Sequence, residues 1–429
     1  MDDSTRRALL AELQQEMVAL LAWLEQTEDL ELERAEHAAR ERMLAMGARL
    51  LEAGLAARGT GKADSRAPCA CGGVATFEGY RSKDVQTLVG WLRLRRAYYV
   101  CPGCGHGGCP LDVRLGLQRD SHSPGVRRLA ARFGALLPFA PAAATLADAA
   151  GICLSASTVR SVTEALGARR EAQIVAQVAA AWTAGVARAT AAPPDRLYVA
   201  MDGVRILGTD GAGREAKVGV VVPVGRTPGG ERRAAASYAA SFEPAEAFGR
   251  RLALEAHRRG LERAAESAVL GDGAAWIWNL AAEHFPGAVQ IVDWFHASER
   301  IWELGRALHG EGAPETTRWV ERQLGRLAHG EATALAGEWR SLPCRGEAAT
   351  VRDEQVIYFT NQADRMAYDR YRAAGWDIGS GMVESACKYL IGAREKGPGM
   401  RWSEPGANHV AQVRVALFND QWDDALAAA

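Results

Sequence analysis

The chain has 429 residues, of which 48% are hydrophobic and 24% charged, and these values predict a folded protein with more than one domain. The 51 Lys and Arg residues nearly balance the 52 Asp and Glu residues, so the molecule as a whole has no large positive charge. Any nucleic acid would therefore have to bind a local basic patch. The uncharged stretch 133–147 is broken by Pro138 and Pro141 and is shorter than the roughly 18 apolar residues of a membrane helix. With no secretory signal at the N-terminus, we expect an intracellular protein without a membrane span.

Apolar residues recur every three or four positions through residues 1–58, which predicts two amphipathic helices. Asp29 is a candidate N-cap of the second helix, and Glu31 and Glu33 lie in its first turn, where the helix dipole favours acidic side chains. Residues 1–65 carry 8 basic and 13 acidic side chains, a net charge of −5. We therefore expect a helical hairpin arm that does not bind DNA by itself and that packs on the body of the protein or on a second subunit.

The composition changes after a Gly/Lys/Asp/Ser linker at 59–65. Residues 66–132 carry 11 basic and 4 acidic side chains, a net charge of +7, and this reversal locates the expected nucleic-acid face. Three arginines of this region, Arg93, Arg95 and Arg96, are candidate phosphate contacts next to a pair of tyrosines. The alternative is that they form an ordinary solvated strand face.

Two cysteine pairs flank an alternating stretch at 74–100, and these are Cys69 with Cys71 and Cys101 with Cys104. Zn²⁺ favours four soft ligands in a tetrahedron, and two turns that each present a cysteine pair supply them. We predict a zinc ribbon over 66–115 with one structural Zn²⁺, and His106 and Cys109 are reserve ligands. The single-residue gap of the first pair is shorter than the usual gap of two.

Residues 142–170 have the pattern of a helix, a turn at Gly151 and a second helix that Ser155 or Ser157 can cap. We predict a helical, helix-turn-helix DNA-binding region over 120–190. Its candidate DNA contacts are Arg127, Arg128 and Arg160. A plain helix pair in a protein core remains the alternative.

The pattern changes to strands after residue 195. The expected elements in chain order are strands at 197–201, 218–222 and 234–241, a helix at 244–259, a strand at 268–270, a helix at 274–285 and a strand at 288–292, with glycines such as Gly211 and Gly229 in the turns. The fold class is therefore α/β, and the order βββαβαβ fits an RNase H-like core.

In such a core the first and fourth strands are neighbours, so Asp202 and Asp272 can face each other. Glu384 supplies a third acid from a helix that continues to Arg394 and stops at Gly397. Three carboxylates can hold two Mg²⁺ ions about 3.5–4 Å apart for phosphodiester chemistry. The alternative for the two Asp-Gly pairs is a simple turn.

The spacing between Asp272 and Glu384 is too long for one helix and one strand. Residues 297–375 have helical periodicity, so we expect an all-helical insertion there. The catalytic domain then comprises 195–296 and 376–425. Four basic residues on or after the Glu384 helix are candidate DNA contacts, and these are Lys388, Arg394, Lys396 and Arg401.

Several motifs of this chain resemble those of the DDE transposases of bacterial insertion sequences, and the Kra-type group in particular. They are Met201-Asp202-Gly203, Gly271-Asp272-Gly273-Ala274, Val292-Asp293-Trp294-Phe295-His296-Ala297 and Gly379-Ser380-Gly381-x-Val383-Glu384-Ser385. A Tyr-Tyr-x-Cys-x-x-Cys-Gly segment at 98–105, followed by Pro-Leu-Asp at 110–112, is similar to the same group. The resemblance implies a catalytic triad of Asp202, Asp272 and Glu384 that binds Mg²⁺ or Mn²⁺.

The resemblance also matches Asp293 and His296 to an Asp-x-x-His signature, which makes them auxiliary candidates. Their alternative is a strand-end cap and a buried structural histidine. The lone cysteines Cys153, Cys344 and Cys387 are expected to be packing residues.

The expected function is a transposase that cleaves the DNA ends of its element and transfers the 3′-hydroxyl to target DNA. The expected partners are double-stranded DNA, in the form of terminal repeats and target, and further copies of the chain in a homo-oligomer. The expected location is the bacterial cytoplasm, with the nucleoid. The alternatives are a catalytically silent DNA-binding regulator and an RNase H-like nuclease without strand transfer.

Overall fold

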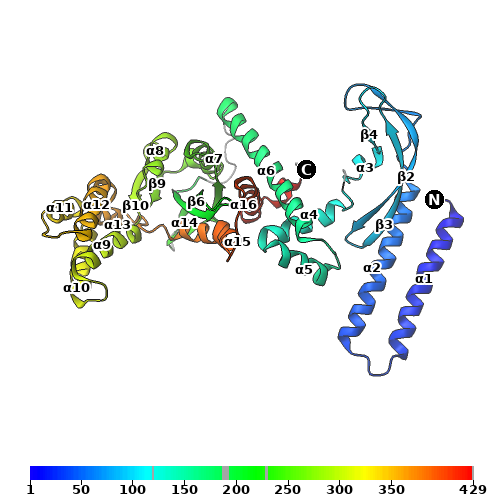
Figure 1. Cartoon of the computed structure of the whole chain (residues 1–429), viewed down its shortest axis with the longest axis horizontal. Coiled ribbons are helices and arrows are strands. Elements are labelled where there is room, and N and C mark those ends of the chain that lie inside the picture. Colours follow the sequence, from blue (N-terminus) through cyan, green and yellow to red (C-terminus); the bar gives the residue numbers. More distant parts are fainter. Residues whose placement is uncertain (118–119, 186–192, 228–229, 428–429) are drawn as a thin grey trace. The chain divides into compact units, whose positions relative to one another are not determined.

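The computed structural model describes residues 1–117, 120–185, 193–227 and 230–427 of a mixed α/β protein (Figure 1). The chain forms two compact units, Met1–Val162 and Thr163–Ala429, and the boundary lies inside the predicted 120–190 region. Residues 186–190 of that region, and the predicted turn residue Gly229, lie outside the described residues.

The first unit begins with a helical hairpin and continues with a sheet and short helices. Its elements are α1 (Asp3–Gln26), α2 (Leu32–Ala57), β1 (Arg66–Pro68), β2 (Val74–Thr87), β3 (Gly90–Val100), β4 (Gly107–Gly108), α3 (Pro110–Arg114), α4 (Pro124–Leu136), α5 (Phe139–Ala150) and the start of α6 (Ala156–Ala184). The two predicted N-terminal helices are confirmed. The predicted N-cap Asp29 is wrong: Asp29 lies in the turn at φ 52°, which Asp tolerates, and Glu31 occupies the cap position without a side-chain hydrogen bond.

The sheet of the first unit is antiparallel, in the order β1-β2-β3-β4. A tight turn joins β2 to β3, where Thr87 pairs with Gly90 at φ 126°. Val85, Leu92 and Leu94 point to a buried cluster, while Arg93, between the two leucines, is on the opposite face, as the period of two requires.

Three helices follow the sheet and share a small apolar core. Its buried members are Val126, Ala130, Ala142, Leu146, Ile152 and Val159. Gly151 ends α5 at φ 67°, and Ser155 caps α6 by accepting the Thr158 N–H at 3.0 Å. The predicted helix, turn and helix are confirmed, although α6 runs on to Ala184.

The second unit contains the other sheet. After the remainder of α6, its elements are β5 (Arg196–Leu207), β6 (Gly213–Thr227), β7 (Gly230–Arg233), β8 (Ser237–Ser241), α7 (Ala245–Arg258), η1 (Leu261–Arg263), β9 (Glu266–Gly271), α8 (Ala275–His284), β10 (Val289–Val292), α9 (Trp294–His309), α10 (Pro314–Ala328), α11 (Ala332–Trp339), α12 (Glu347–Gln362), η2 (Ala363–Arg365), α13 (Tyr368–Ala373), α14 (Gly381–Ala386), η3 (Cys387–Gly392), α15 (Ala393–Glu395), α16 (Glu404–Phe418) and α17 (Trp422–Ala427).

The strand order of this sheet is β10-β9-β5-β6-β7, and β8 also pairs with β6. β5 and β10 are parallel to β9, whereas β6 is antiparallel to β5 and to β8. The predicted adjacency of the first and fourth strands is thus confirmed as β5 beside β9. The predicted strand 234–241 is shorter than expected, because only Ser237–Ser241 pairs with β6. The run 197–201 is completely buried, as expected for a strand in the middle of a covered sheet.

Helices cover the sheet and fill the predicted insertion. α7 and α14 contact β6, and α16 contacts β8. From Trp294 to Ala373 the regular elements are all helical, which confirms the predicted insertion, and Trp339 stacks edge-on against Phe359 in its core. The predicted single helix after Gly379 contains a π-helical turn, η3, between α14 and α15.

Candidate metal sites and nucleic-acid surface

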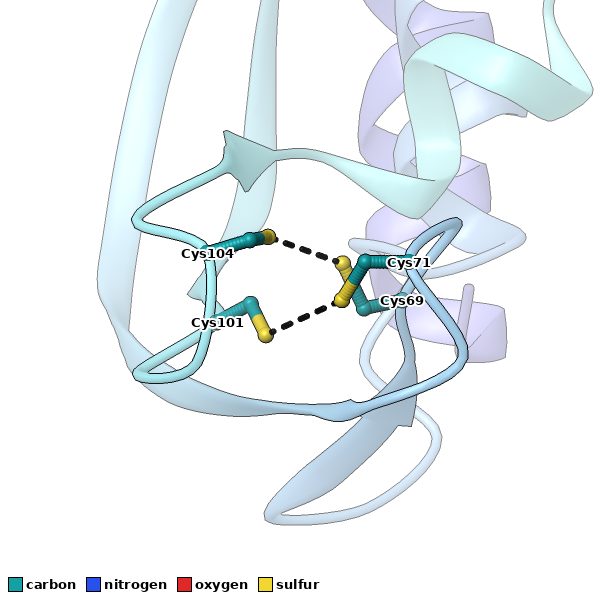
Figure 2. Close-up of side chains that lie close together, drawn as sticks. All are labelled: Cys69, Cys71, Cys101 and Cys104. Atoms are coloured by element: carbon teal, nitrogen blue, oxygen red, sulfur yellow. Dashed lines mark hydrogen bonds between the residues drawn. The ribbon is translucent and has the colours of Figure 1, made fainter.

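Four cysteines converge at one end of the first sheet. Cys69 and Cys71 lie in the turn between β1 and β2, and Cys101 and Cys104 lie in the turn after β3 (Figure 2). Their Sγ atoms all lie within 4.8 Å of one another, with 3.7 Å from Cys69 to Cys104 and 3.8 Å from Cys71 to Cys101. The backbone N–H of Cys104 lowers the pKa of Cys101 to about 7, so one thiol ionises readily. The donor set and its compactness fit a four-coordinate soft metal ion such as Zn²⁺.

The reserve ligands are not part of this group. Cys109 is buried next to α3, and burial raises the pKa of its thiol. His106 holds the turn through its backbone, because its carbonyl accepts the Cys101 N–H at 2.9 Å. Within the described ranges, the four-cysteine group is the only set of three or more His, Cys, Asp or Glu ligand atoms gathered this closely.

Two arginines of the β2–β3 hairpin stack on tyrosines, one pair on each face of the sheet, because the register places Arg81 opposite Arg96 and Arg95 opposite Ser82. The Arg81 guanidinium lies 3.3 Å from the centre of the Tyr98 ring, and that of Arg95 lies 4.0 Å from the Tyr80 ring. Stacking holds the guanidinium planes while their N–H groups remain available for phosphates. The sequence predicted Arg95 here but missed Arg81, whose partner is across the hairpin.

Two predicted DNA contacts on this unit face inward. Arg96 is 8% exposed and bonds to the Asp112 carboxylate, which lies 16 residues away on α3. Arg127 bonds to the Gly116 carbonyl and pairs with Asp120 at 3.4 Å. In this conformation neither guanidinium is free to contact a phosphate. Arg93 is exposed on β3, and Arg128 and Arg160 are exposed on α4 and α6.

In the second unit, Asp202 and Asp272 lie at matching positions of two neighbouring parallel strands. Ala200 of β5 pairs with Leu270 of β9, and each carboxylate comes two residues later. Burial raises the pKa of Asp202, the Gly203 N–H lowers it in part, and the negative charge of Asp272 raises it further. The structure therefore brings these two predicted acids together in a half-buried position where their charges interact.

The insertion holds the turn that carries Asp272. The Tyr358 hydroxyl of α12 donates to the Asp272 carbonyl at 2.7 Å, and the Gln362 amide donates to the Gly273 carbonyl at 2.9 Å. Gly273 has φ 102°, and a Cβ there would lie 2.7 Å from the Tyr358 ring. The sequence analysis missed Tyr358 and Gln362, because neither belongs to an acidic motif.

Glu384 does not form a close group of metal-ligating atoms with the other two acids. Its side chain is 55% exposed and pairs with Lys388 at 2.6 Å, one helical turn later. The residue that meets Asp202 from this helix is Cys387, whose Sγ lies 3.5 Å from Asp202 Oδ2. Burial raises the pKa of the Cys387 thiol, and the charge of Asp202 adds to the effect. The prediction of Cys387 as a mere packing residue thus missed a contact with the acid pair.

Asp293 joins the two ends of the insertion. Its Oδ1 accepts the N–H groups of Phe295 and His296 at 2.6 and 3.0 Å, which makes it the N-cap of α9. Its Oδ2 accepts the N–H of Ser380, the residue that begins the Glu384 helix. The structure supports the alternative of a strand-end cap for Asp293.

His296 extends from this cap toward the acid pair. Its Nδ1 is 3.4 Å from Asp293 Oδ1, and its side chain is 38% exposed, so it is not a buried structural histidine. The interaction with Asp293 raises the pKa of His296, burial lowers it in part, and the charges of Asp272 and Asp202 raise it further.

We expect Asp293→Asn to lower the pKa of His296, because the substitution removes the charge that most favours the imidazolium. The raised pKa means that the pair stabilises the fold at acidic pH and that this contribution is lost as the pH rises through the folded-state pKa. Titration of the histidine resonances by NMR measures the change, with the other histidines as internal reference. An unchanged midpoint for His296 would contradict the assigned partner.

The basic residues after the Glu384 helix divide into buried and exposed. Arg394 is 1% exposed, its guanidinium lies 5.0 Å from the Trp402 ring, and burial lowers its pKa to about 10. Arg394 is therefore a core residue here and not an accessible DNA contact. Lys388 pairs with Glu384, whereas Lys396 and Arg401 are exposed.

No protein-family model matches this chain, and no curated protein matches it either. In the described part of the chain, every helix is too short or too polar to cross a membrane.

Proposed function

We propose that the protein is a metal-dependent DNA transposase of the DDE type with an RNase H-like catalytic core. The observation that carries the proposal is the pair Asp202 and Asp272 on the parallel strands β5 and β9. The pairing of β8 with β6, β6 with β5, β5 with β9 and β9 with β10 agrees with the strand order of such a core. Motifs that resemble the Kra-type transposases surround both acids.

The proposed chemistry is displacement at a DNA phosphodiester. Bound Mg²⁺ would lower the pKa of the attacking water or hydroxyl and stabilise the leaving oxygen. Asp202 and Asp272 would hold the metal, and Tyr358 and Gln362 would keep the Asp272 turn in place. A protonated His296 beside the pair would offer a positive charge to the phosphate.

The proposal requires Glu384 to leave Lys388 and turn toward the acid pair when metal and DNA bind. An exposed ion pair between residues i and i+4 contributes only about 0.3–0.5 kcal/mol, so this contact is a weak restraint. The observed position of Glu384 nevertheless favours a second candidate, a DNA-binding regulator that performs no chemistry.

The four-cysteine centre and the exposed arginines of β3, Arg93 and Arg95, would supply DNA binding. A structural Zn²⁺ would fix the turn after β3, and hence the strand that presents Arg93 and Arg95. Phosphate contacts of this kind release counterions, so the affinity should fall steeply with salt.

The test is incubation of the purified protein with labelled DNA that carries candidate element ends, in the presence of Mg²⁺. We expect cleaved ends and products joined to target DNA. Cleavage without joining would indicate the nuclease alternative. Salt-dependent binding with no cleavage in Mg²⁺ or Mn²⁺ would indicate the regulator.

A further inference from the structure

The N-terminal helical hairpin has an apolar face that meets solvent. α1 and α2 run antiparallel side by side (Figure 1) and are in contact, and their buried side chains are Leu13 and Leu20 on α1 and Met46 on α2. Four large apolar side chains beside this contact are half exposed, and these are Leu10 at 53%, Met17 at 50%, Met43 at 53% and Leu50 at 47%. Leu21, at 57%, continues the row on α1. A row of such residues marks an interaction surface more often than an isolated exposed leucine does.

The exposed residues of both helices lie on the same side of the hairpin. On each helix they come three positions before and four positions after a buried contact residue: Leu10 and Met17 around Leu13, and Met43 and Leu50 around Met46. Positions i−3 and i+4 lie on one flank of a helix. Because the helices are antiparallel, the same offset turns both flanks to the same side. We call these four residues together with Leu21 the hairpin face.

The two ends of the hairpin carry opposite charge. Residues 25–34, around the turn, include five acidic side chains and one basic, a net charge of −4. The open end, 1–7 with 53–58, includes three basic and two acidic side chains, a net charge of +1. Both acids at the open end are engaged within α1, since Asp2 caps the helix at Thr5 and Asp3 pairs with Arg6 at 3.4 Å.

This polarity distinguishes between the two symmetric ways in which two hairpin faces can meet. A two-fold axis along the helices would bring the two acidic turns together, and their like charges would repel. A two-fold axis across the helices places each acidic turn beside the basic open end of the other copy.

The antiparallel arrangement matches the spacing of the apolar side chains on α1. With the axis between residues 15 and 16, Leu10 lies opposite Leu21 of the second copy and Met17 lies opposite Gln14. Arg7 then lies close to Glu25 of the second copy. Gly54 on α2 has open space where a Cβ would be, which leaves room for a partner side chain.

We propose that the hairpin face is a homodimer interface, in which two copies of the chain pack antiparallel as a four-helix bundle. The occupant is a second copy because the antiparallel arrangement pairs Leu10 with Leu21 on α1 and places the acidic turn of each copy beside the basic open end of the other. This inference is independent of the proposed catalytic function, because it involves neither the acids nor the DNA-binding face.

The test is the mass of the full-length protein in solution, measured by light scattering or sedimentation equilibrium over a range of concentrations. We expect about twice the 46.0 kDa of one chain. The double variant Met17→Glu/Met43→Glu places four carboxylates near the centre of the interface, so dimerisation should weaken by about 100-fold or more. Both side chains are half exposed in one copy, so the variant should fold, which circular dichroism checks.

The matched control is Ala19→Glu, which introduces the same charge on α1 at an exposed position on the other flank of the helix, six residues after Leu13. It should remain dimeric. Arg7→Glu should weaken the dimer, because it removes the attraction between Arg7 of one copy and Glu25 of the other. Adding Glu25→Arg restores opposite charges at these two positions, so the double variant should dimerise again. The proposal would be overturned if the wild-type protein were monomeric at about 100 μM, because even a weak interface with a micromolar Kd would be filled at that concentration. A folded Met17→Glu/Met43→Glu variant with the wild-type mass would overturn it as well.

Discussion

Asp202→Asn is expected to lower Mg²⁺-dependent strand cleavage by about 1,000-fold or more, because the amide keeps the shape of the side chain but loses the charge that holds the metal. The fold should survive. Burial raises the pKa of Asp202, which means that the position disfavours the charge, and a neutral amide removes that cost. Asp272→Asn should have the same effect on cleavage. Rates of strand cleavage and thermal unfolding curves measured on the same preparations check both statements.

The control is Asp210→Asn, the same substitution in the exposed turn after β5. Asp210 accepts the Ala212 N–H at 3.0 Å and pairs with Arg214 at 2.5 Å, away from the acid pair. Its cleavage rate should match that of the wild-type protein. If Asp202→Asn retained cleavage within tenfold of this control, the acid pair would not be the metal site.

Glu384→Gln then tests whether Glu384 belongs to the catalytic group. Loss of cleavage in this variant would mean that Glu384 reaches the acid pair in the active complex, in spite of its contact with Lys388. Wild-type cleavage would remove Glu384 from the catalytic group. Asp293→Asn is a less specific comparison, since the Asp293 carboxylate caps α9 and bonds to Ser380, and its loss should lower stability as well as activity.

Local patterns in the sequence account for the elements that carry the site. The buried run 197–201 and the Gly-Asp-Gly turn at 271–273 indicate two strands that end in acids, and the strand order places them side by side. The cysteine pairs are equally local, because each pair lies in one short turn. The strands, the acids at their ends and the cysteine pairs depend on residues close together in the chain, which is why they were predicted.

The features that were not predicted depend on distant partners. The sequence predicts that Arg96 is exposed on its strand, but Arg96 forms an ion pair with Asp112 of α3. It also predicts that Arg394 contacts DNA, but the Arg394 guanidinium lies against the ring of Trp402. The π-helical turn η3 also has no signature in the periodicity of the sequence. Its first residue, Cys387, contacts Asp202, so the helix meets the acid pair through a thiol and not through Glu384.

Cys101→Ser is expected to abolish metal binding at the four-cysteine centre and to unfold the sheet around it. Cys101 is 1% exposed and packs with Ala75, Ala97 and Tyr99, so its loss disturbs both the metal site and the small core beside it. Structural Zn²⁺ contributes on the order of 10 kcal/mol to the folding of small zinc modules, which is more than a sheet of this size can supply by packing. Removal of the metal by a chelator should therefore have the same effect as the substitution.

Metal analysis of protein purified without chelator should give about one equivalent of zinc for the wild-type chain and none for Cys101→Ser, as expected for one tetrahedral site. Hydrogen exchange should show loss of protection in β2 and β3, while the helices of the second unit stay protected, because the two units have separate cores. Cys153→Ser, at an exposed cysteine outside the cluster, should keep both zinc and protection. Less than half an equivalent of zinc in the wild-type protein, or a Cys101→Ser variant with unaltered protection, would mean that the four thiols do not hold a structural metal ion.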